Sequence, residues 1–257
     1  MKVVILAGGL GTRLSEETTI RPKPLVEIGG KPILWHIMKI YSTYGFNDFI
    51  ICTGYKGEMI KDYFSNYVTR NSDLDIDLSA GKITQLTYPK ELWKVKVIDT
   101  GQDTMTGGRL AKVSKYLEEG KFMMTYGDGV SDVNIHDLLR FHYSHGRKAT
   151  LTAVIPHGRY GSLEVDNNTV MKFNEKKIGG DGWINAGFFV LDKSVIDLIE
   201  SDDTIFEGAP LRKLSENGEL MAYKHNGFWR PMDTLNDKIV LEKLWSYGKP
   251  PWKVWSE

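Results

Sequence analysis

The stretch VVILAGGLGTRL, residues 3–14, predicts how the chain begins to fold. Its first part, Val3 to Leu6, is a short β-branched and apolar run that indicates a buried strand. Its second part is rich in glycine, which lets a backbone turn sharply and approach another molecule closely. We therefore expect the first strand of an α/β sheet, with the glycine loop at the carboxyl end of that strand, where such sheets bind ligands.

Predicted strands and helices alternate through the first half of the chain. The further predicted strands are residues 49–52, 121–126 and 149–155, and the predicted helices are residues 32–44, 108–118 and 135–145. Alternation of this kind argues for βαβ units, in which helices cover a parallel sheet. We predict an α/β fold that is Rossmann-like, with a mixed, mostly parallel sheet and helices on both faces.

The pattern changes from about residue 158. RYGSLEVDNNTVMKFNEKK, residues 159–177, predicts two short strands around an Asp-Asn-Asn turn, and WINAGFFVL, residues 183–191, predicts another strand. Helices are expected over residues 204–218 and 234–247, with an extended segment at 219–224 between them. No repeat or low-complexity linker is visible, so we expect one domain, residues 1–257, with a β-rich insertion.

The C-terminal tail KPPWKVWSE, residues 249–257, holds Trp252 and Trp255. Large apolar side chains are usually buried, and exposed ones would be awkward in a monomer. We favour a tail that folds back into the core over one that forms a subunit contact.

The glycine loop, residues 8–11, has the properties of a phosphate cradle, because successive free N–H groups in such a turn bind anions. It is neither of two common phosphate loops. The dinucleotide fingerprint G-x-G-x-x-G, begun at Gly9, would need glycine where Leu14 stands, and the G-K-[ST] of the P-loop is absent. A Rossmann dehydrogenase is therefore set aside, and a phosphate site of another kind is expected.

Basic residues close to this loop support the same interpretation. Arg13 ends the loop, and Lys23 lies between two prolines that restrict its backbone. Arginine offers a fork for two phosphate oxygens, and lysine offers a compact charge. Arg21 is a third, less specific candidate.

Two aspartates are candidates to hold Mg²⁺, which prefers one or two carboxylates together with phosphate oxygens. Asp128 follows the apolar predicted strand FMMTY, between two glycines. Asp233 lies between a proline-bearing turn and the last predicted helix, where a helix N-cap is an equally good interpretation. Because the two are far apart in the chain, only the fold could bring them together.

Other candidate sites are weaker. His142 and His145 share a predicted helix face, but an exposed helix end explains them better than a metal does. Cys52 lies in an apolar strand and is expected to be a small core residue. No Ser, His and Asp set surrounds a recognisable nucleophile elbow. A reaction without a covalent enzyme intermediate is indicated.

Composition excludes several classes of partner. The chain has 33 Lys plus Arg against 33 Asp plus Glu, whereas proteins that coat nucleic acids or anionic membranes normally carry excess basic charge. No apolar run is long enough to cross a bilayer, and the one at the N-terminus is too short for a signal peptide. The single cysteine fits a reducing compartment. We expect a cytoplasmic protein that binds neither nucleic acid nor membrane.

The motifs resemble those of the sugar-phosphate nucleotidyltransferases. LAGGLGTRL followed by PKPLVEIGGKPILWHIM is similar to the family's pattern of GGxGTRL, then P-K, then K-P. Four later segments resemble, within this family, the glucose-1-phosphate cytidylyltransferases in particular; they are DTGQDTMTGGRLAKV (99–113), TYGDGVSD (125–132), INAGFFVL (184–191) and GFWRPMDTLNDK (227–238). The resemblance covers nearly the whole chain.

This resemblance implies that CTP and α-D-glucose 1-phosphate give CDP-glucose and pyrophosphate with Mg²⁺. It implies a mainly nucleotide-binding part, about residues 1–157, and a part with the sugar site and the C-terminal helix, about residues 158–257. The implied catalytic residues are Arg13, Lys23 and Asp128, and the implied metal ligands are Asp128 and Asp233. The implied nucleotide-binding residues are Leu6, Ala7, Gly8, Gly9, Leu10, Gly11, Thr12, Arg13, Lys23, Thr104, Gly108, Arg109 and Gly127.

The implied sugar-phosphate residues are Gly161, Glu175, Lys176 and Asn185. The family's usual E-K-P is here Glu175-Lys176-Lys177, so Lys177 could compete with Lys176 for the sugar phosphate. The implied assembly is a homo-oligomer, and a hexamer in particular. Two alternatives stay open, namely an enzyme of this class that uses UTP or dTTP and a regulatory module that senses nucleotide sugars without catalysis.

Overall fold

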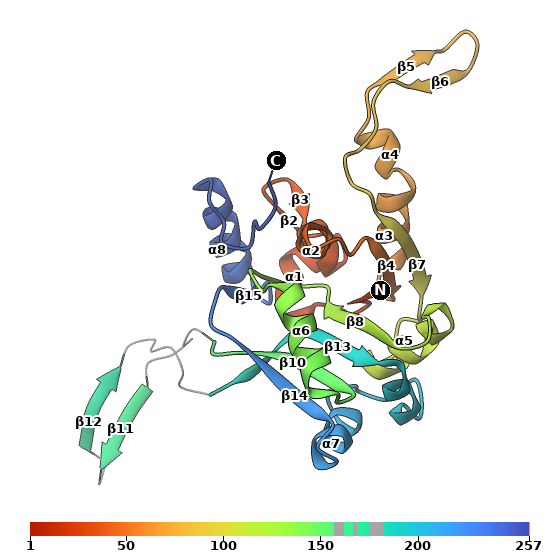
Figure 1. The fold of residues 1–257 in the computed structure, drawn as a ribbon. Coiled ribbons are helices and arrows are strands. Elements are labelled where there is room, and N and C mark those ends of the chain that lie inside the picture. Colours follow the sequence, from red (N-terminus) through yellow and green to blue (C-terminus); the bar gives the residue numbers. More distant parts are fainter. Residues whose placement is uncertain (157–161, 167–168, 175–181, 257) are drawn as a thin grey trace.

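The first strand lies near the middle of a seven-stranded sheet in the computed structural model, which describes residues 1–156, 162–166, 169–174 and 182–256 (Figure 1). The strands, in spatial order, are β14 (Leu220–His225), β10 (Ala149–Val154), β13 (Ile184–Asp192), β8 (Lys121–Tyr126), β1 (Val3–Ala7), β4 (Asp48–Thr53) and β7 (Lys94–Asp99). Neighbours pair in parallel except β13, which is antiparallel to both β8 and β10. The predicted mixed, mostly parallel sheet is confirmed.

Side chains of β1 alternate between two cores, one on each face of the sheet. Val3 and Ile5 pack with residues of α2 (Ile33–Thr43), α6 (Ile135–His145) and α8 (Leu235–Ser246). Val4 and Leu6 pack with residues of α5 (Thr106–Val113) and α7 (Ala209–Glu216). Both faces are therefore covered by helices, as the strand–helix alternation predicts.

Two predicted helices are shorter in the structure than the sequence suggests. The predicted helix over residues 108–118 is α5, which ends at Val113 and continues as a 3-10 turn, η3 (Ser114–Tyr116). The predicted helix over residues 204–218 begins only at Ala209, with Pro210 in its first turn. Proline is favoured at the first positions of a helix because it lacks the N–H that would be unpaired there, so Pro210 marks the true start. In the preceding segment the Thr204 carbonyl accepts from the N–H of Gly107.

Smaller elements complete the chain. The helical ones are η1 (Thr12–Leu14), α1 (Ser15–Thr18), η2 (Lys23–Leu25), α3 (Gly57–Ser65), α4 (Tyr67–Arg70) and η4 (Lys193–Leu198). The strand pairs are β2 (Glu27–Ile28) with β3 (Lys31–Pro32), β5 (Leu74–Asp77) with β6 (Lys82–Gln85), β9 (Gly129–Ser131) with β15 (Trp229–Pro231), and β11 (Ser162–Asp166) with β12 (Thr169–Asn174). The last pair confirms the two predicted strands of the insertion.

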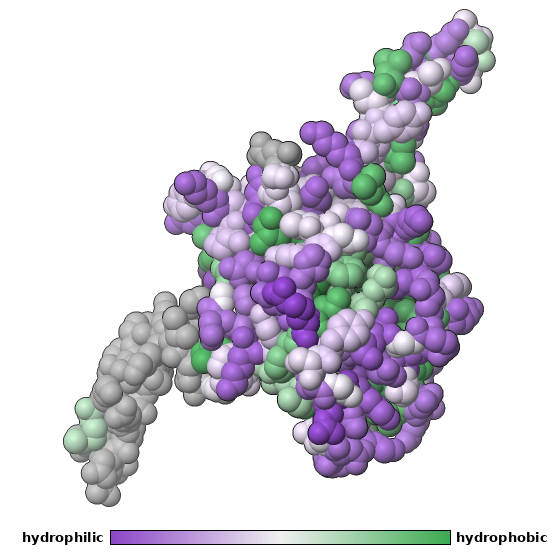
Figure 2. All heavy atoms as spheres, in the orientation of Figure 1, coloured by the Kyte–Doolittle hydropathy of each residue, from purple (hydrophilic) through white to green (hydrophobic). Residues whose placement is uncertain are grey.

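The β5–β6 hairpin projects away from the sheet (Figure 1). It carries apolar side chains that remain in solvent, among them Leu78, which is 89% exposed, and Ile83, which is 61% exposed. Figure 2 shows apolar residues along this arm. No element of the described chain covers these side chains. None of the described helices has the length and apolarity needed to cross a bilayer.

The C-terminal tail folds back, as predicted, around a buried histidine. Trp252 is fully buried and Trp255 packs against the same core. His36 lies between them, and its Nε2 is 2.9 Å from the Ile28 carbonyl oxygen while the Trp252 indole N–H donates to its Nδ1 at 3.4 Å. These two contacts fit a neutral imidazole that carries its proton on Nε2. Burial lowers the pKa of His36 to about 4.

When the pH is lowered from 7 to 4.5, we expect the free energy of unfolding to decrease by about 2 kcal/mol because of His36. Its pKa is lower in the folded protein than in the unfolded chain, so the unfolded chain binds more protons between about pH 6.5 and 4. Urea unfolding at the two pH values measures the loss. His36→Gln should remove most of it, and His136→Gln, at an exposed histidine, is the matched control. An equal pH dependence in wild type and His36→Gln would contradict the assignment.

Candidate active site

Two aspartates that are far apart in sequence meet beside the glycine loop. Asp128 immediately precedes β9, and Asp233 follows β15 closely. These two short strands pair antiparallel with Pro231 opposite Gly129, and the N–H of Met232 donates to the Asp128 carbonyl at 2.8 Å. The small ribbon therefore fixes both carboxylates at the carboxyl end of β8, next to β1.

Lys23 joins these carboxylates. Its Nζ lies 2.7 Å from Oδ2 of Asp128 and 2.8 Å from Oδ1 of Asp233. Pro22 and Pro24 frame Lys23, which opens the 3-10 helix η2. Burial, the largest single effect on the pKa of Lys23, lowers it, but the two carboxylates together outweigh burial and hold the pKa above its usual value. Lys23 is therefore a cation throughout the physiological pH range.

Arg13 adds a second cation at the mouth of the site. Its Nη1 lies 3.2 Å from Oδ2 of Asp233, and its side chain is 67% exposed. An ion pair this exposed to water contributes little to stability. The guanidinium can therefore leave Asp233 and bind a phosphate with little loss of free energy.

The glycine loop depends on glycine at two positions. Gly11 has a φ of 65°, in the left-handed region that side chains disfavour, and a Cβ there would lie 3.3 Å from Cβ of Lys23. A Cβ on Gly8 would lie only 2.1 Å from Nη1 of Arg109. The loop thus packs directly on the two basic residues that surround it.

Arg109 is held below the loop by backbone carbonyls. Its Nη2 donates to the Gly8 carbonyl at 3.0 Å, and its Nη1 donates to the Thr53 and Gly101 carbonyls at 2.9 and 2.8 Å. The side chain is buried and its terminal nitrogens are occupied. In this structure Arg109 stabilises the loop conformation, and its guanidinium does not reach outward as a phosphate ligand would.

A cavity of about 350 Å³ lies at this edge of the sheet. Most of the predicted site residues line it, namely Leu6, Ala7, Gly8, Gly9, Gly11, Thr12, Arg13, Lys23, Thr104, Arg109, Gly127 and Asp128. The carboxyl ends of parallel strands are where α/β sheets bind ligands, and the backbone N–H groups of a glycine-rich turn can bind anions. The sequence motifs therefore converge on one site.

Some predicted residues lie elsewhere. Leu10 is half exposed, outside the residues that line the cavity. Gly108 packs against the backbone of Asp202, where a Cβ would meet the Asp202 carbonyl oxygen at 2.4 Å, so its role in the structure is close packing of α5. Asn185 adjoins the cavity through Tyr126, to whose hydroxyl it donates at 3.0 Å. Gly161, Glu175 and Lys176 lie outside the described residues.

Sequence reasoning missed four residues that border the cavity, Pro24, Met105, Thr106 and Tyr126, and the last two are polar. Tyr126 lines it from the last position of β8, and Thr106 lines it from the first turn of α5. Both contact the carboxylate of Glu207. The position of Tyr126 at a strand end, directly before Gly127, is a signal that could have identified it. Glu207 lies in an exposed turn, where the sequence gives no comparable signal.

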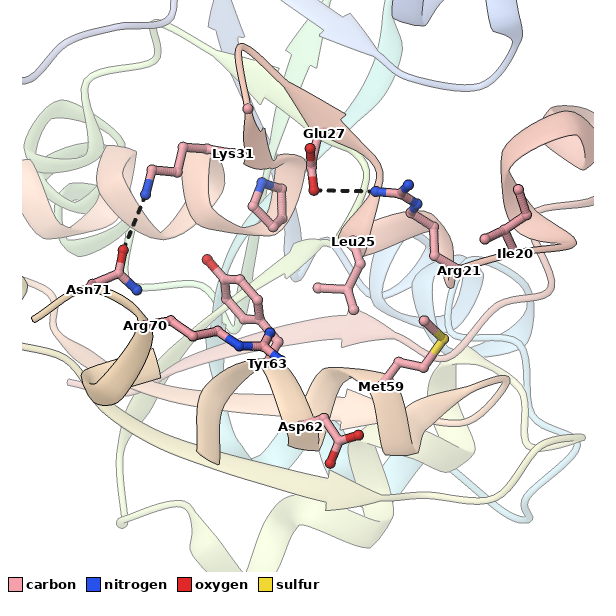
Figure 3. A pocket seen from close by; sticks show the side chains of 12 residues that line it. Ile20, Arg21, Leu25, Glu27, Lys31, Met59, Asp62, Tyr63, Arg70 and Asn71 are labelled. Atoms are coloured by element: carbon pink, nitrogen blue, oxygen red, sulfur yellow. Dashed lines mark hydrogen bonds and ion pairs between the residues drawn. The ribbon is translucent and has the colours of Figure 1, made fainter. Parts of the chain in front are cut away.

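Arg21, the third basic candidate, does not join the phosphate site. It lines a separate cavity of about 470 Å³ between α3 and the β2–β3 hairpin, together with Tyr63 and Arg70 (Figure 3). Its Nη1 lies 3.2 Å from Oε1 of Glu27. The predicted catalytic and nucleotide-binding residues do not line this second cavity.

The weaker candidates have structural explanations. His142 and His145 both lie within 2.9 Å of Oγ1 of Thr150, and burial lowers the pKa of His142 to about 4. Cys52 is fully buried in β4, and burial raises the pKa of its thiol to about 12. Among the described residues no three His, Cys, Asp or Glu side chains gather as a metal cluster. A metal that binds mainly through substrate phosphates does not need one.

The residues present fit a divalent cation at Asp128 and Asp233. Both carboxylates contact a single positive group, the ammonium of Lys23, so they already converge on one cationic position. One or two carboxylates together with phosphate oxygens are the ligand set that Mg²⁺ prefers.

Comparisons with known proteins identify the family of this chain. A family model described as nucleotidyl transferase matches residues 2–239. The glucose-1-phosphate cytidylyltransferase of Salmonella typhi is 56% identical over 256 residues, which is 99% of this chain and 100% of that protein.

Solved structures share the fold. HddC from Yersinia pseudotuberculosis aligns with a TM-score of 0.70 at 27% identity, over 95% of this chain and 99% of that one. An apo UDP-glucose pyrophosphorylase aligns with a TM-score of 0.69 at 14% identity, over 96% and 98% of the two chains, and this likeness supports the fold alone. By its motifs, its site and these relatives, the chain belongs to the nucleotidyl transferase family.

Proposed function

We propose that this enzyme transfers CMP from CTP to α-D-glucose 1-phosphate and releases pyrophosphate, giving CDP-glucose. The 56% identity to a glucose-1-phosphate cytidylyltransferase, over nearly all of both chains, supports the choice of substrates. The observation that carries the chemistry is the contact of Lys23 with both Asp128 and Asp233 beside the glycine loop.

The proposed reaction is an in-line displacement. A phosphate oxygen of glucose 1-phosphate attacks the α-phosphorus of CTP, and the bond to the β-phosphate oxygen breaks as pyrophosphate leaves. Two anions must meet, so positioning and charge neutralisation supply most of the catalysis. Lys23 neutralises charge at the α-phosphate, and Arg13 does so at the leaving pyrophosphate.

The residues of the loop and its neighbours hold the nucleotide. Gly8, Gly9 and Gly11 line the cavity, and their N–H groups are the proposed donors to phosphate oxygens. Thr104 and Gly127 contact the rest of the nucleotide. Arg109 keeps the loop in this conformation through the Gly8 carbonyl.

Asp128 and Asp233 are the proposed ligands of Mg²⁺. When bound, this ion would neutralise phosphate charge at the reacting group. Before substrate binds, Lys23 balances the same two carboxylates, which lets them lie close together without mutual repulsion.

The sugar side of the site is proposed to come from the second half of the chain. Asn185, with Gly161, Glu175 and Lys176, would hold glucose 1-phosphate, and Lys177 competes with Lys176 for its phosphate. In this proposal the nucleotide-binding part, about residues 1–157, and the sugar-binding part, about residues 158–257, form one domain. Asp233 belongs to the second part and completes the metal site of the first.

Pyrophosphate release with CTP, UTP and dTTP, each with glucose 1-phosphate and Mg²⁺, tests the proposed substrates. The proposal expects kcat/KM to be highest with CTP by at least about 10-fold, the effect of one base-specific contact. A preference for UTP or dTTP would show that the chain is a nucleotidyltransferase with another nucleotide specificity. If the protein binds nucleotides but turns over none of the three, a regulatory module that senses nucleotide sugars is indicated.

We also propose that the protein is a cytoplasmic homo-oligomer, with a hexamer as the specific expectation. The exposed apolar arm of β5 and β6 supports an oligomer, because soluble monomers rarely leave such side chains in water. Size-exclusion chromatography with light scattering gives the mass of the assembly.

Leu78→Lys combined with Ile83→Lys should lower this mass if the arm contacts another copy, whereas Lys61→Glu on α3 should leave it unchanged. A monomeric wild type would contradict the proposal.

A further inference from the structure

The hydroxyl of Thr104, a residue in the wall of the cavity at the glycine loop, has its polarity set by a lysine behind it. Thr104 lines that cavity and is only 7% exposed. The ammonium of Lys112, in the last turn of α5, donates to Thr104 Oγ1 at 3.0 Å. An ammonium has hydrogens to donate and no lone pair to accept with, so the Thr104 oxygen must accept in this bond. The hydroxyl hydrogen of Thr104 is therefore left to donate to another group.

Lys112 is held in this position by two further acceptors. Its Nζ donates to the Thr100 carbonyl at 3.0 Å and lies 2.5 Å from Oδ2 of Asp202. The hydrogens of the ammonium are thus matched by the oxygens of Thr100, Thr104 and Asp202. The side chains of Lys112 and Asp202 are 38% and 59% exposed, so this ion pair contributes little stability by itself. The contact of Lys112 that reaches the cavity wall is the one to Thr104.

The backbone around Thr104 is fixed as well. The N–H of Met105 donates to the Asp202 carbonyl at 2.9 Å. Gly101 has a φ of 92°, and a Cβ there would lie 2.8 Å from Thr104 Oγ1, so glycine leaves the room that the hydroxyl occupies. Within the described chain the Thr104 hydroxyl donates to no acceptor. A nearly buried hydroxyl with an unused hydrogen gains free energy when a ligand supplies an acceptor.

We propose that Lys112 is a positioning residue that makes Thr104 a hydrogen-bond donor to an acceptor atom of the bound nucleotide. This inference rests on the proposed function, in which Thr104 contacts the nucleotide. Lys112 lies outside the residues that line the cavity, so it acts through the orientation of the Thr104 hydroxyl. Without the ammonium this hydroxyl can rotate, and an oxygen lone pair then faces the acceptor of the nucleotide in place of the hydrogen.

Steady-state kinetics of Lys112→Met tests the proposal, because methionine is also a long unbranched side chain but cannot donate. We expect KM for CTP to rise about 10-fold, the effect of one lost hydrogen bond. The values of kcat and of KM for glucose 1-phosphate should stay within about 3-fold of wild type. Lys112→Arg keeps a cation that only donates and should restore most of the affinity for CTP. Lys115→Met, at an exposed lysine of η3, is the matched control and should behave as wild type.

A double-mutant cycle separates the orientation of the hydroxyl from general support of the loop. Thr104→Val removes the hydroxyl, so it should raise KM for CTP about as much as Lys112→Met does, and the double variant should be no worse than either single one. If Lys112 only supported the loop through Thr100, the two losses would multiply, and this result would overturn the inference. An unchanged KM for CTP in folded Lys112→Met would overturn it too. Loss of CMP transfer in wild type would instead overturn the proposed function.

Discussion

Lys23→Ala is expected to lower turnover by at least about 100-fold, the effect of removing one preorganised charge from an active site. Its ammonium sits between the carboxylates of Asp128 and Asp233, and in the proposed mechanism it meets the phosphate at which bonds change. Pyrophosphate release under saturating CTP and glucose 1-phosphate measures the loss.

Arg21→Ala is the matched control for this variant. Arg21 lies two positions earlier, on the side of the same segment that faces the second cavity, and it forms ion pairs with Glu27 and Glu17 (Figure 3). We expect its turnover to stay within about 3-fold of wild type, as is usual for an exposed ion pair. If Lys23→Ala kept near-normal turnover while correctly folded, the catalytic role of Lys23 would be wrong.

The Lys23→Ala variant also tests whether the carboxylates of Asp128 and Asp233 form one cation site. Without the ammonium, the like charges of Asp128 and Asp233 lose the one cation that both contact, which destabilises the folded protein. A ligand that binds only the folded state stabilises it. Mg²⁺ should therefore raise the melting temperature of Lys23→Ala more than that of wild type, even without nucleotide. Equal shifts in the two proteins would argue against a cation site at this pair.

Asp128→Ala is expected to lower turnover by at least about 100-fold as well, through the metal site. Its carboxylate is fixed by the β9–β15 ribbon at the end of β8, beside the glycine loop. The loss should be accompanied by a higher Mg²⁺ concentration at half-maximal rate, which Lys23→Ala should not show. Titration of the rate with Mg²⁺ at fixed CTP separates the two variants.

Asp62→Ala is the control for the metal-site variant, because Asp62 is an exposed carboxylate that lines the other cavity. It should leave both the rate and the Mg²⁺ dependence unchanged. A normal rate in folded Asp128→Ala, or an unaltered Mg²⁺ dependence beside a low rate, would remove Asp128 from the proposed metal ligands.

The nucleotide side of this site could be predicted from the sequence because its determinants are local. A buried strand, three glycines and a lysine between prolines are contiguous from residue 3 to residue 24. The alternation of strands and helices then places the loop at the ligand-binding edge of the sheet. The positions of Lys23 and Arg13 follow from these short-range patterns.

The meeting of Asp233 with Asp128 could not be derived from local sequence alone. It depends on the pairing of β9 with β15, two strands of three residues each that carry no strong strand pattern. Locally, Asp233 is indistinguishable from a helix cap, and the structure shows that Thr234 and Asp237 form the capping box of α8 instead. Only the resemblance to a known family favoured Asp233 as a metal ligand.

Arg109 and Glu207 show a second limit of sequence reasoning. A charged residue in a motif predicts contact with a ligand, but whether the charge reaches the ligand depends on what surrounds it. Five acceptors from three segments hold the Arg109 guanidinium under the loop. The Glu207 carboxylate accepts hydrogen bonds from Tyr126 and Thr106, which come from elements distant in sequence.

The central claim is that the bond to the α-phosphorus of CTP is exchanged for a bond to glucose 1-phosphate. Incubation of the enzyme with [α-³²P]CTP, glucose 1-phosphate and Mg²⁺, followed by separation of the products, tests this claim most directly. The account predicts that label appears in CDP-glucose in equal amount to the unlabelled pyrophosphate released. Label that remained in CTP, or that appeared as free CMP whether or not glucose 1-phosphate was present, would contradict it.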